Sequence, residues 1–150
     1  MNFMNKGLLF FLIFIVAGVS DLQAQEQYST SSKRAANYFN DAMKQYRLRE
    51  FDKALANIDK ALDKDEEFIE AFIVRGQIHE EQRNYQQAMN AYTSAIEIDP
   101  DFFPNVLYSA GLLAIKMGRY EQARDFLNRF LVKDKVGPAM KAKAKKQLNT

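Results

Sequence analysis

Apolar residues recur along most of the chain at the three- and four-residue spacing that places them on one face of an α-helix. Between residues 69 and 98 this spacing occurs in two stretches, with the polar residues 81–84 between them. Pro100 follows the second stretch and ends it, because proline cannot continue a helix. The pattern predicts two helices joined by a short polar turn.

The same helix pair occurs three times, with a period of 34 or 35 residues. Each copy has an aromatic residue with an alanine three positions later and a small residue nine positions earlier. The three positions are filled by Phe51, Tyr85 and Tyr120, by Ala54, Ala88 and Ala123, and by Ala42, Gly76 and Gly111. Small residues let two crossing helices approach closely. Since one helix pair cannot bury its apolar face alone, the period predicts an all-α solenoid of three stacked helix-turn-helix repeats.

This arrangement resembles the tetratricopeptide repeat family. The second repeat matches the family pattern at Phe72, Gly76, Tyr85, Ala88, Tyr92, Ala95 and Pro100. The first repeat matches at Tyr38, Ala42, Phe51, Ala54 and Ala61, and the third at Gly111, Tyr120 and Ala123. Phe130 stands where the family has alanine, and this departure predicts that the stack loosens or changes partner after the third repeat.

The first 24 residues have the layout of a secretory signal peptide. Lys6 precedes an apolar run at residues 8–19, which is too short to span a membrane comfortably, and small and polar residues follow the run. We expect cleavage after Ala24, with Ser20 as the second candidate. The mature chain is then exported, to the periplasm or to the outer membrane. An uncleaved N-terminal anchor is the alternative.

The remaining chain divides into a lead-in, the three repeats and a C-terminal helix. The predicted bounds are 25–34 for a flexible lead-in, 35–68, 69–102 and 103–137 for the repeats, and 138–150 for a basic capping helix. Ser31 and Ser32 can cap the first helix, and Pro138 is suited to starting the last one. The lysines of this last helix are interpreted as the solvated face of a cap; attachment to nucleic acid or anionic lipid is the alternative.

Composition excludes several function classes. Lys and Arg number 21 against 19 Asp and Glu, and this balance argues against a nucleic-acid-binding protein. The chain has no cysteine and a single histidine, His79, which excludes thiol chemistry and most histidine-based metal sites. The acidic residues 63–67 lack the glycine and the later glutamate of a calcium-binding loop. We predict no catalysis, no metal, no cofactor and no small-molecule substrate.

The family resemblance implies a binding face for a partner protein on the first helices of the repeats. The residues that it places on this concave face are Phe39, Asn40, Met43, Tyr46, Glu70, Ile73, Gln77, Glu80, Asn105, Tyr108, Leu112 and Ile115. They make the face apolar and aromatic, with an acidic middle. Alternatively, this face packs against the lead-in, the C-terminal helix or a following domain.

A clamp for a C-terminal carboxylate, which some family members have, is not expected. The basic positions of that clamp hold Phe39, Asn105 and Ser109 in this sequence.

The predicted function is a non-catalytic protein–protein interaction scaffold of the bacterial cell envelope. The alternative is a structural spacer or a self-associating module of an envelope or secretion complex. A second resemblance supports the envelope setting: the signal peptide, the three repeats and the segment 95–104 are similar to the N-terminal repeat region of exported Bacteroidetes envelope proteins. That group includes OmpA-like proteins and proteins associated with type IX secretion.

Overall fold

The computed structural model describes residues 28–149, and this part of the chain is entirely helical apart from its turns and loops. Its helices are α2 (Lys33–Arg47), α3 (Phe51–Leu62), α4 (Ile69–Glu81), α5 (Tyr85–Ile98), α6 (Asn105–Lys116), α7 (Tyr120–Leu131) and α8 (Pro138–Leu148). The all-α prediction is therefore confirmed. No helix within residues 28–149 is both long and apolar enough to cross a membrane. The predicted signal peptide, residues 1–24, lies outside the described residues.

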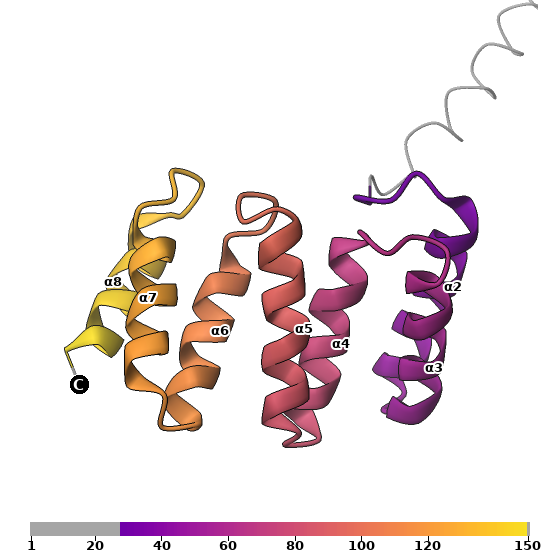
Figure 1. Ribbon diagram of the computed structural model, residues 1–150, viewed down its shortest axis with the longest axis horizontal. Coiled ribbons are helices and arrows are strands. Elements are labelled where there is room, and N and C mark those ends of the chain that lie inside the picture. Colours follow the sequence, from indigo (N-terminus) through magenta and orange to yellow (C-terminus); the bar gives the residue numbers. More distant parts are fainter. Residues whose placement is uncertain (1–27, 150) are drawn as a thin grey trace, which may run out of the picture.

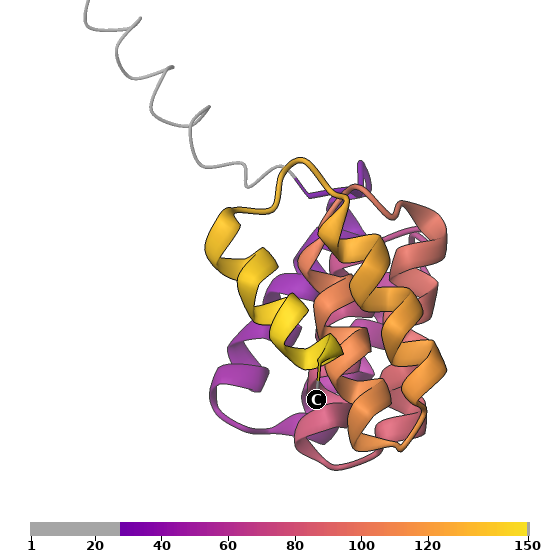
Figure 2. The same cartoon turned by 90° about the vertical axis from the view of Figure 1, so that its left-hand side faces the viewer.

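The helices form three antiparallel pairs that stand side by side in one row (Figure 1). Within the pairs, α2 packs against α3, α4 against α5, and α6 against α7. Successive pairs meet through α3 with α4 and through α5 with α6, and α8 packs against α7 at the end of the row (Figure 2). The solenoid of helix-turn-helix repeats is thus present as the sequence period predicts.

Local polar contacts set the ends of several helices. The Ser32 hydroxyl accepts a hydrogen bond from the backbone N–H of Ala35, so Ser32 caps the start of α2. After α5, the Asp99 carboxylate accepts bonds from the backbone N–H groups of Asp101 and Phe102 at 2.8 and 3.1 Å. These bonds hold the loop between the second and third repeats in a tight turn.

The turn inside each helix pair contains one residue in the left-handed backbone region. These residues are Arg49 (φ 60°), Arg83 (φ 61°) and Gly118 (φ 70°). Each follows the last residues of a first helix and precedes the aromatic that starts the second helix. The three turns therefore share one backbone conformation, although glycine, which adopts it most easily, is present only in the third.

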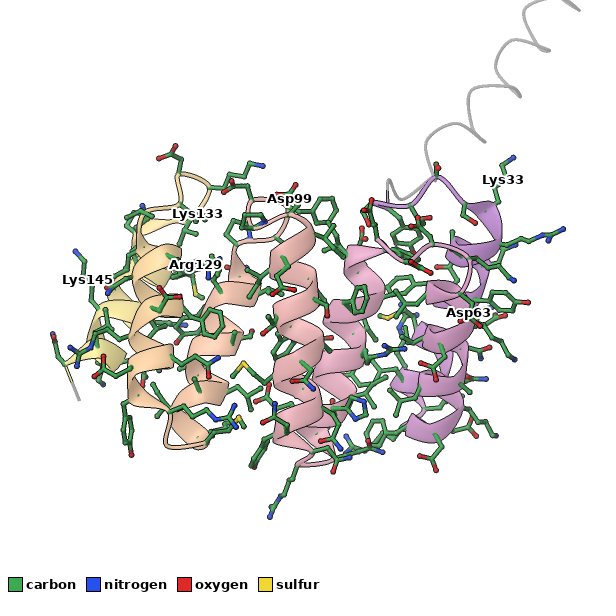
Figure 3. The ribbon with its side chains drawn as sticks, viewed as in Figure 1. Lys33, Asp63, Asp99, Arg129, Lys133 and Lys145 are labelled. Atoms are coloured by element: carbon green, nitrogen blue, oxygen red, sulfur yellow. The ribbon has the colours of Figure 1, made fainter. Side chains whose placement is uncertain are left out.

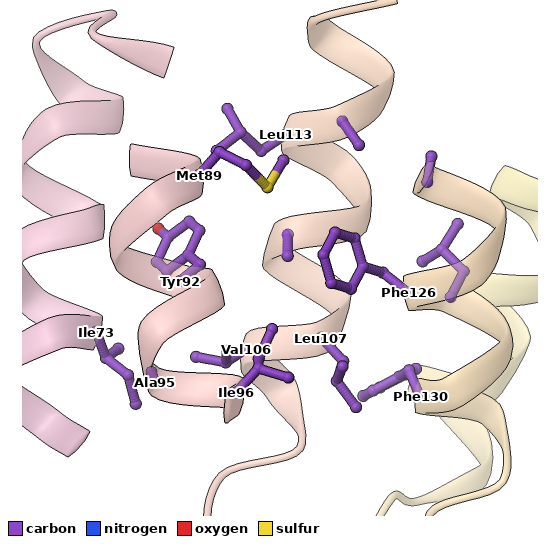
Figure 4. Packing of buried hydrophobic residues seen from close by; sticks show 14 of the residues in the cluster. Ile73, Met89, Tyr92, Ala95, Ile96, Val106, Leu107, Leu113, Phe126 and Phe130 are labelled. Atoms are coloured by element: carbon purple, nitrogen blue, oxygen red, sulfur yellow. The ribbon is translucent and has the colours of Figure 1, made fainter. Parts of the chain in front are cut away.

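The buried residues form two hydrophobic clusters that lie on opposite sides of α4. On one side, Phe68, Ala71, Val74 and Ile78 pack with α2 and α3. On the other side, Ile69 and Ile73 pack with a cluster that runs through α5, α6 and α7 to α8 (Figure 4). Because α4 has buried residues on two faces, it forms the wall between the first repeat and the rest.

The stack continues into α8 after the third repeat. Phe130 is fully buried in the second cluster, together with Val136 and Ala144 from the C-terminal segment. Lys133 pairs with Asp101 at 2.6 Å and joins the loop after α7 to the loop before α6. Of the two outcomes predicted from Phe130, loosening does not occur, because the cluster that buries this side chain continues into the C-terminal segment. The other outcome, a change of packing partner after the third repeat, agrees with the packing of α7 against α8.

The exposed side of α8 carries lysines, including Lys145, which points outward at the end of the row (Figure 3).

Candidate functional site

The first helices of the three pairs, α2, α4 and α6, run in the same direction and together form one face, here called the groove face. Near their C-terminal ends, residues of all three helices line an open pocket of about 440 Å³. We call it the central pocket, and it is lined by Tyr46, Gln77, Glu80, Glu81, Tyr92 and Lys116. Three of these residues, Tyr46, Gln77 and Glu80, belong to the predicted binding face, and the structure brings them together.

Glu80 is the hub of one polar cluster in the central pocket. Its carboxylate accepts a hydrogen bond from the Tyr92 hydroxyl at 3.1 Å and pairs with the Lys116 ammonium group at 2.5 Å. Tyr92 comes from α5 and Lys116 from the end of α6, so this cluster joins the second repeat to the third. Burial, followed by the charge of Glu80, raises the pKa of the Tyr92 hydroxyl and keeps it protonated as a donor.

Glu81 forms a second cluster, which joins the first repeat to the second. Its carboxylate accepts a hydrogen bond from the Tyr46 hydroxyl at 2.5 Å and pairs with Arg49 at 3.2 Å. Burial, and then the hydrogen bond and charge of Glu81, raise the pKa of Tyr46 to about 12. Tyr46 therefore remains a neutral hydrogen-bond donor at physiological pH.

The ion pairs of Glu80 with Lys116 and of Glu81 with Arg49 change the predicted electrostatics of the groove face. The expected acidic middle consists of Glu70 and Glu80, and of these Glu80 is balanced by Lys116. The neighbouring Glu81, which was not predicted, is balanced by Arg49. The central pocket consequently presents hydroxyl, amide and paired charged groups to a ligand.

Where α2 lies beside the start of α4, the groove face is covered by residues 28–30, which we call the strap. The ring of Tyr28 lies 5.2 Å from that of Phe39, and the Tyr28 hydroxyl donates a hydrogen bond to Asn40 at 2.7 Å. The Ser29 hydroxyl donates to Glu70 at 2.6 Å. For Phe39, Asn40 and Glu70, the alternative of packing against the lead-in is thus what the structure shows.

The remaining predicted residues lie along the same face with different exposure. Ile73 is buried in the core, and Tyr108 is half-buried against the ring of Phe130 at 5.4 Å. Asn105 is exposed, whereas Met43, Leu112 and Ile115 are half-buried. Their participation in binding stays a prediction.

Sequence reasoning missed several residues of the central pocket. Tyr92 is a match to the family pattern, which accounts for its ring and not for its hydroxyl. Glu81 and Lys116 are each the residue next to a predicted one on the same helix, Glu80 and Ile115. A wider helical face at the ends of α4 and α6 would have included both.

A second pocket, of about 380 Å³, lies between α3 and α5 and is lined in part by Asp59, Arg75 and His79. Burial, and then the charge of Arg75, lower the pKa of His79, and its buried Nδ1 atom has no hydrogen-bond partner. No group of three or more His, Cys, Asp or Glu residues within residues 28–149 is arranged to hold a metal ion.

Comparison with known families identifies the repeats. Two family models described as tetratricopeptide repeat match the chain, one over residues 39–101 and the other over residues 79–146. The chain belongs to the tetratricopeptide repeat family. Together the two matches extend from the first helix pair to α8. No curated protein sequence matches the chain significantly.

Solved structures with the same fold include proteins from several settings. The crystal structure of MamA aligns with a TM-score of 0.62 and 19% identity, over 75% of this chain and 61% of that one. The Yersinia enterocolitica type III secretion chaperone SycD, in complex with a peptide of the translocator YopD, aligns with a TM-score of 0.70 and 16% identity, over 79% and 92% of the two chains.

The first repeat domain of Spaghetti (RPAP3), bound to the HSP90 peptide SRMEEVD, aligns with a TM-score of 0.68 and 14% identity, over 81% and 98%. At these identities the likeness establishes the tetratricopeptide fold.

Proposed function

We propose that this tetratricopeptide repeat protein is a non-catalytic interaction scaffold that holds a segment of a partner protein in the central pocket of its groove face. The observation that carries the proposal is the composition of this pocket, because residues of all three first helices meet in it. A site that joins three repeats suits a segment several residues long better than a small molecule.

The chemistry of the central pocket supports binding of a polypeptide. Tyr46, which the proposal places at the contact surface, has an apolar ring and a hydroxyl whose proton is donated to Glu81 and whose oxygen can accept a hydrogen bond. Gln77 is exposed and offers an amide that can both donate and accept hydrogen bonds from a peptide backbone. Aromatic residues with polar tips are enriched at protein interfaces for this reason.

The solved structures of the same fold add support, since two of them contain a bound peptide. The SycD complex holds a peptide of YopD, and the Spaghetti domain holds a peptide of HSP90. Because this chain shares their fold, we propose that it also binds a peptide.

We further propose that the protein works in the cell envelope, on the basis of the signal-peptide layout of residues 1–24. Cell fractionation followed by intact-mass measurement tests this part. A periplasmic or outer-membrane species that starts at Gln25 is expected. A full-length species in the inner membrane would mean that residues 8–19 act as an anchor.

Quantitative affinity capture tests the binding proposal. Tagged wild-type protein and a Tyr46→Ala, Gln77→Arg double variant are expressed in the source cells, and the retained proteins are compared by mass spectrometry. We expect at least one protein to be retained at least tenfold less by the variant. Tyr120→Ala is the matched control, because Tyr120 is exposed at the start of α7 and lines no part of the central pocket. Equal retention by the double variant and wild type would refute the assignment.

The structural alternative is a self-associating assembly module. Sedimentation at increasing protein concentration separates the two, since a scaffold that binds a foreign segment stays monomeric by itself. A concentration-dependent rise in mass that the Tyr46→Ala, Gln77→Arg variant abolishes would instead identify a second copy of this chain as the partner.

A further inference from the structure

The strap lies on the groove face in the way that a bound peptide would. We propose that the strap is an internal occupant of the groove face, and that the part of the face it covers, between α2 and the start of α4, selects extended segments in which an aromatic residue is followed by serine or threonine. The inference rests on the proposed function and specifies the class of segment that the face accepts. The strap contacts Asn40, 12 positions along the chain from Tyr28, and Glu70, 41 positions from Ser29.

The aromatic half of this motif is recognised by two buried rings. Phe39 and Phe68 lie 4.9 Å apart, with 5% and 0% of their surfaces exposed. The ring of Tyr28 completes the group, at 5.2 Å from Phe39 and 5.7 Å from Phe68, in edge-on and tilted orientations that aromatic rings prefer. Asn40 accepts the hydrogen bond of the Tyr28 hydroxyl at the outer edge. The site therefore fits a tyrosine, with an apolar floor and a polar rim.

The hydroxyl half of the motif is recognised by groups that need both a donor and an acceptor. The Ser29 hydroxyl donates to the Glu70 carboxylate at 2.6 Å and accepts from the backbone N–H of Ile69 at 3.0 Å. Alanine at this position can do neither, and an acidic residue would be repelled by Glu70. Serine and threonine are the residues that meet both requirements.

The helix that receives the hydroxyl depends on it for capping. Phe68, the N-cap residue of α4, offers no side-chain hydrogen bond to the first turn. The Ser29 hydroxyl supplies this bond from 40 residues away in the sequence. A segment that replaces the strap must bring its own hydroxyl or leave this N–H without a partner.

The backbone of the strap is also bound. The N–H of Ser29 donates to both oxygens of Glu70, at 3.0 and 3.3 Å. Glu70 thus accepts hydrogen bonds from the main-chain N–H and the side-chain hydroxyl of the same residue. This double contact fixes the register of an extended segment, and it excludes proline at the serine position because proline has no N–H. Because the strap is tethered to α2, an incoming segment competes with an occupant at high local concentration.

A peptide-binding experiment tests the inference without knowledge of the natural partner. The probe is a fluorescent peptide with the sequence of residues 25–33, QEQYSTSSK, with blocked ends. It is titrated by fluorescence anisotropy into the wild-type protein and into a Tyr28→Ala, Ser29→Ala variant, whose own strap is weakened. We expect the variant to bind at least tenfold more tightly than wild type, because its groove face is vacated.

Controls separate recognition of the motif from nonspecific peptide binding. Ser31→Ala is the matched protein control, since Ser31 is exposed and belongs to the same segment outside the strap. It is expected to bind the peptide as weakly as wild type. Peptides in which alanine replaces the tyrosine, or the serine after it, are expected to lose at least tenfold in affinity for the double variant.

Equal binding by wild type and by the double variant would overturn the inference, as would absence of binding by a variant with wild-type helicity and thermal midpoint. If the double variant loses helicity, the single Tyr28→Ala variant takes its place with the same expected and contradicting results. The proposed function is tested separately at Tyr46 and Gln77 of the central pocket, so the failure of one proposal is distinguishable from the failure of the other.

Discussion

Gly76 of α4 lies directly against the ring of Tyr92 of α5. A Cβ atom at residue 76 would be 2.4 Å from Cε1 and 2.5 Å from Cδ1 of that ring, closer than any ordinary contact between carbon atoms. Tyr92 cannot easily withdraw, because it is almost completely buried and its hydroxyl is bonded to Glu80. The glycine thus sets the distance between the two helices of the second repeat, and through Tyr92 it supports one side of the central pocket.

Gly76→Ala is expected to destabilise the fold. Overpacking of this kind lowers the free energy of unfolding by about 1–3 kcal/mol, which outweighs the roughly 0.5–1 kcal/mol that alanine gains over glycine inside a helix. Urea denaturation monitored by circular dichroism measures the difference.

Two matched glycine substitutions accompany this experiment. At Gly111, a Cβ atom would meet the side chain of Leu127 at 2.8 Å, and a flexible leucine can shift more easily than a bonded tyrosine ring. Gly111→Ala should therefore cost less than Gly76→Ala. Gly137 has no heavy atom near its would-be Cβ, so Gly137→Ala adds no overpacking and changes only the N-cap of α8, where alanine is less favoured than glycine. Equal effects at residues 76 and 137 would contradict the packing argument.

Exchanging residues between the equivalent turns tests the cost of their left-handed backbone. Arg83 has φ 61°, a conformation that costs a non-glycine residue about 1–2 kcal/mol. We expect Arg83→Gly to raise the free energy of unfolding by about 1 kcal/mol and Gly118→Arg to lower it by a similar amount. Thermal and urea denaturation measure both changes. A loss of stability in Arg83→Gly would show that the arginine side chain contributes more than its backbone costs.

The ion pair of Glu80 with Lys116 and its hydrogen bond with Tyr92 are expected to contribute differently to the free energy of unfolding. Lys116 is about half exposed, so its removal in Lys116→Ala should cost at most about 1 kcal/mol. Glu80→Ala removes the acceptor of the buried Tyr92 hydroxyl and should cost about 1–3 kcal/mol. Glu80→Gln keeps an acceptor and should fall between the two. A larger loss in Lys116→Ala than in Glu80→Ala would mean that the ion pair, and not the tyrosine bond, stabilises this junction.

His79 predicts a pH dependence of stability. Its pKa in the folded protein is below the ordinary value of 6.5, so the unfolded chain binds a proton more readily than the folded one. The contribution of His79 to stability is therefore complete above pH 6.5 and is lost as the pH falls through its folded pKa. In His79→Gln, which does not titrate, this part of the decline should be absent. Denaturant titrations between pH 7.5 and 5.5 compare the two proteins, and identical slopes would contradict the assignment.

The sequence predicts the fold well because its signals are local and repeated. The small residue at Gly76 and the alanine at Ala88 carry their meaning in their spacing, and three copies of this pair in register make that spacing unambiguous. Ser32 as the cap of α2 and the covered face of α4 also follow from short-range patterns. Of the two outcomes predicted from Phe130, loosening of the stack is wrong, since its cluster extends into α8, which the repeat pattern does not describe.

The binding face could be predicted only in part, because its polar contacts join residues distant in the sequence. Tyr46 meets Glu81 across 35 positions and Lys116 meets Glu80 across 36, and no spacing rule distinguishes them from neighbours on the same helices. The docking of Ser29 on Glu70 spans 41 positions and comes from a segment whose composition alone indicates a flexible lead-in.

Site-specific photo-crosslinking in the source cells tests the central claim most directly. A photoreactive amino acid replaces Gln77, which lines the central pocket, or Arg124, which is exposed on α7 and lies outside it. We predict a covalent adduct with a partner protein from residue 77, none from residue 124, and loss of the adduct when Tyr46→Ala and Lys116→Ala are added. An adduct from residue 124 alone, or one from residue 77 that these substitutions leave unchanged, would contradict the assignment of the central pocket as the site that holds the partner.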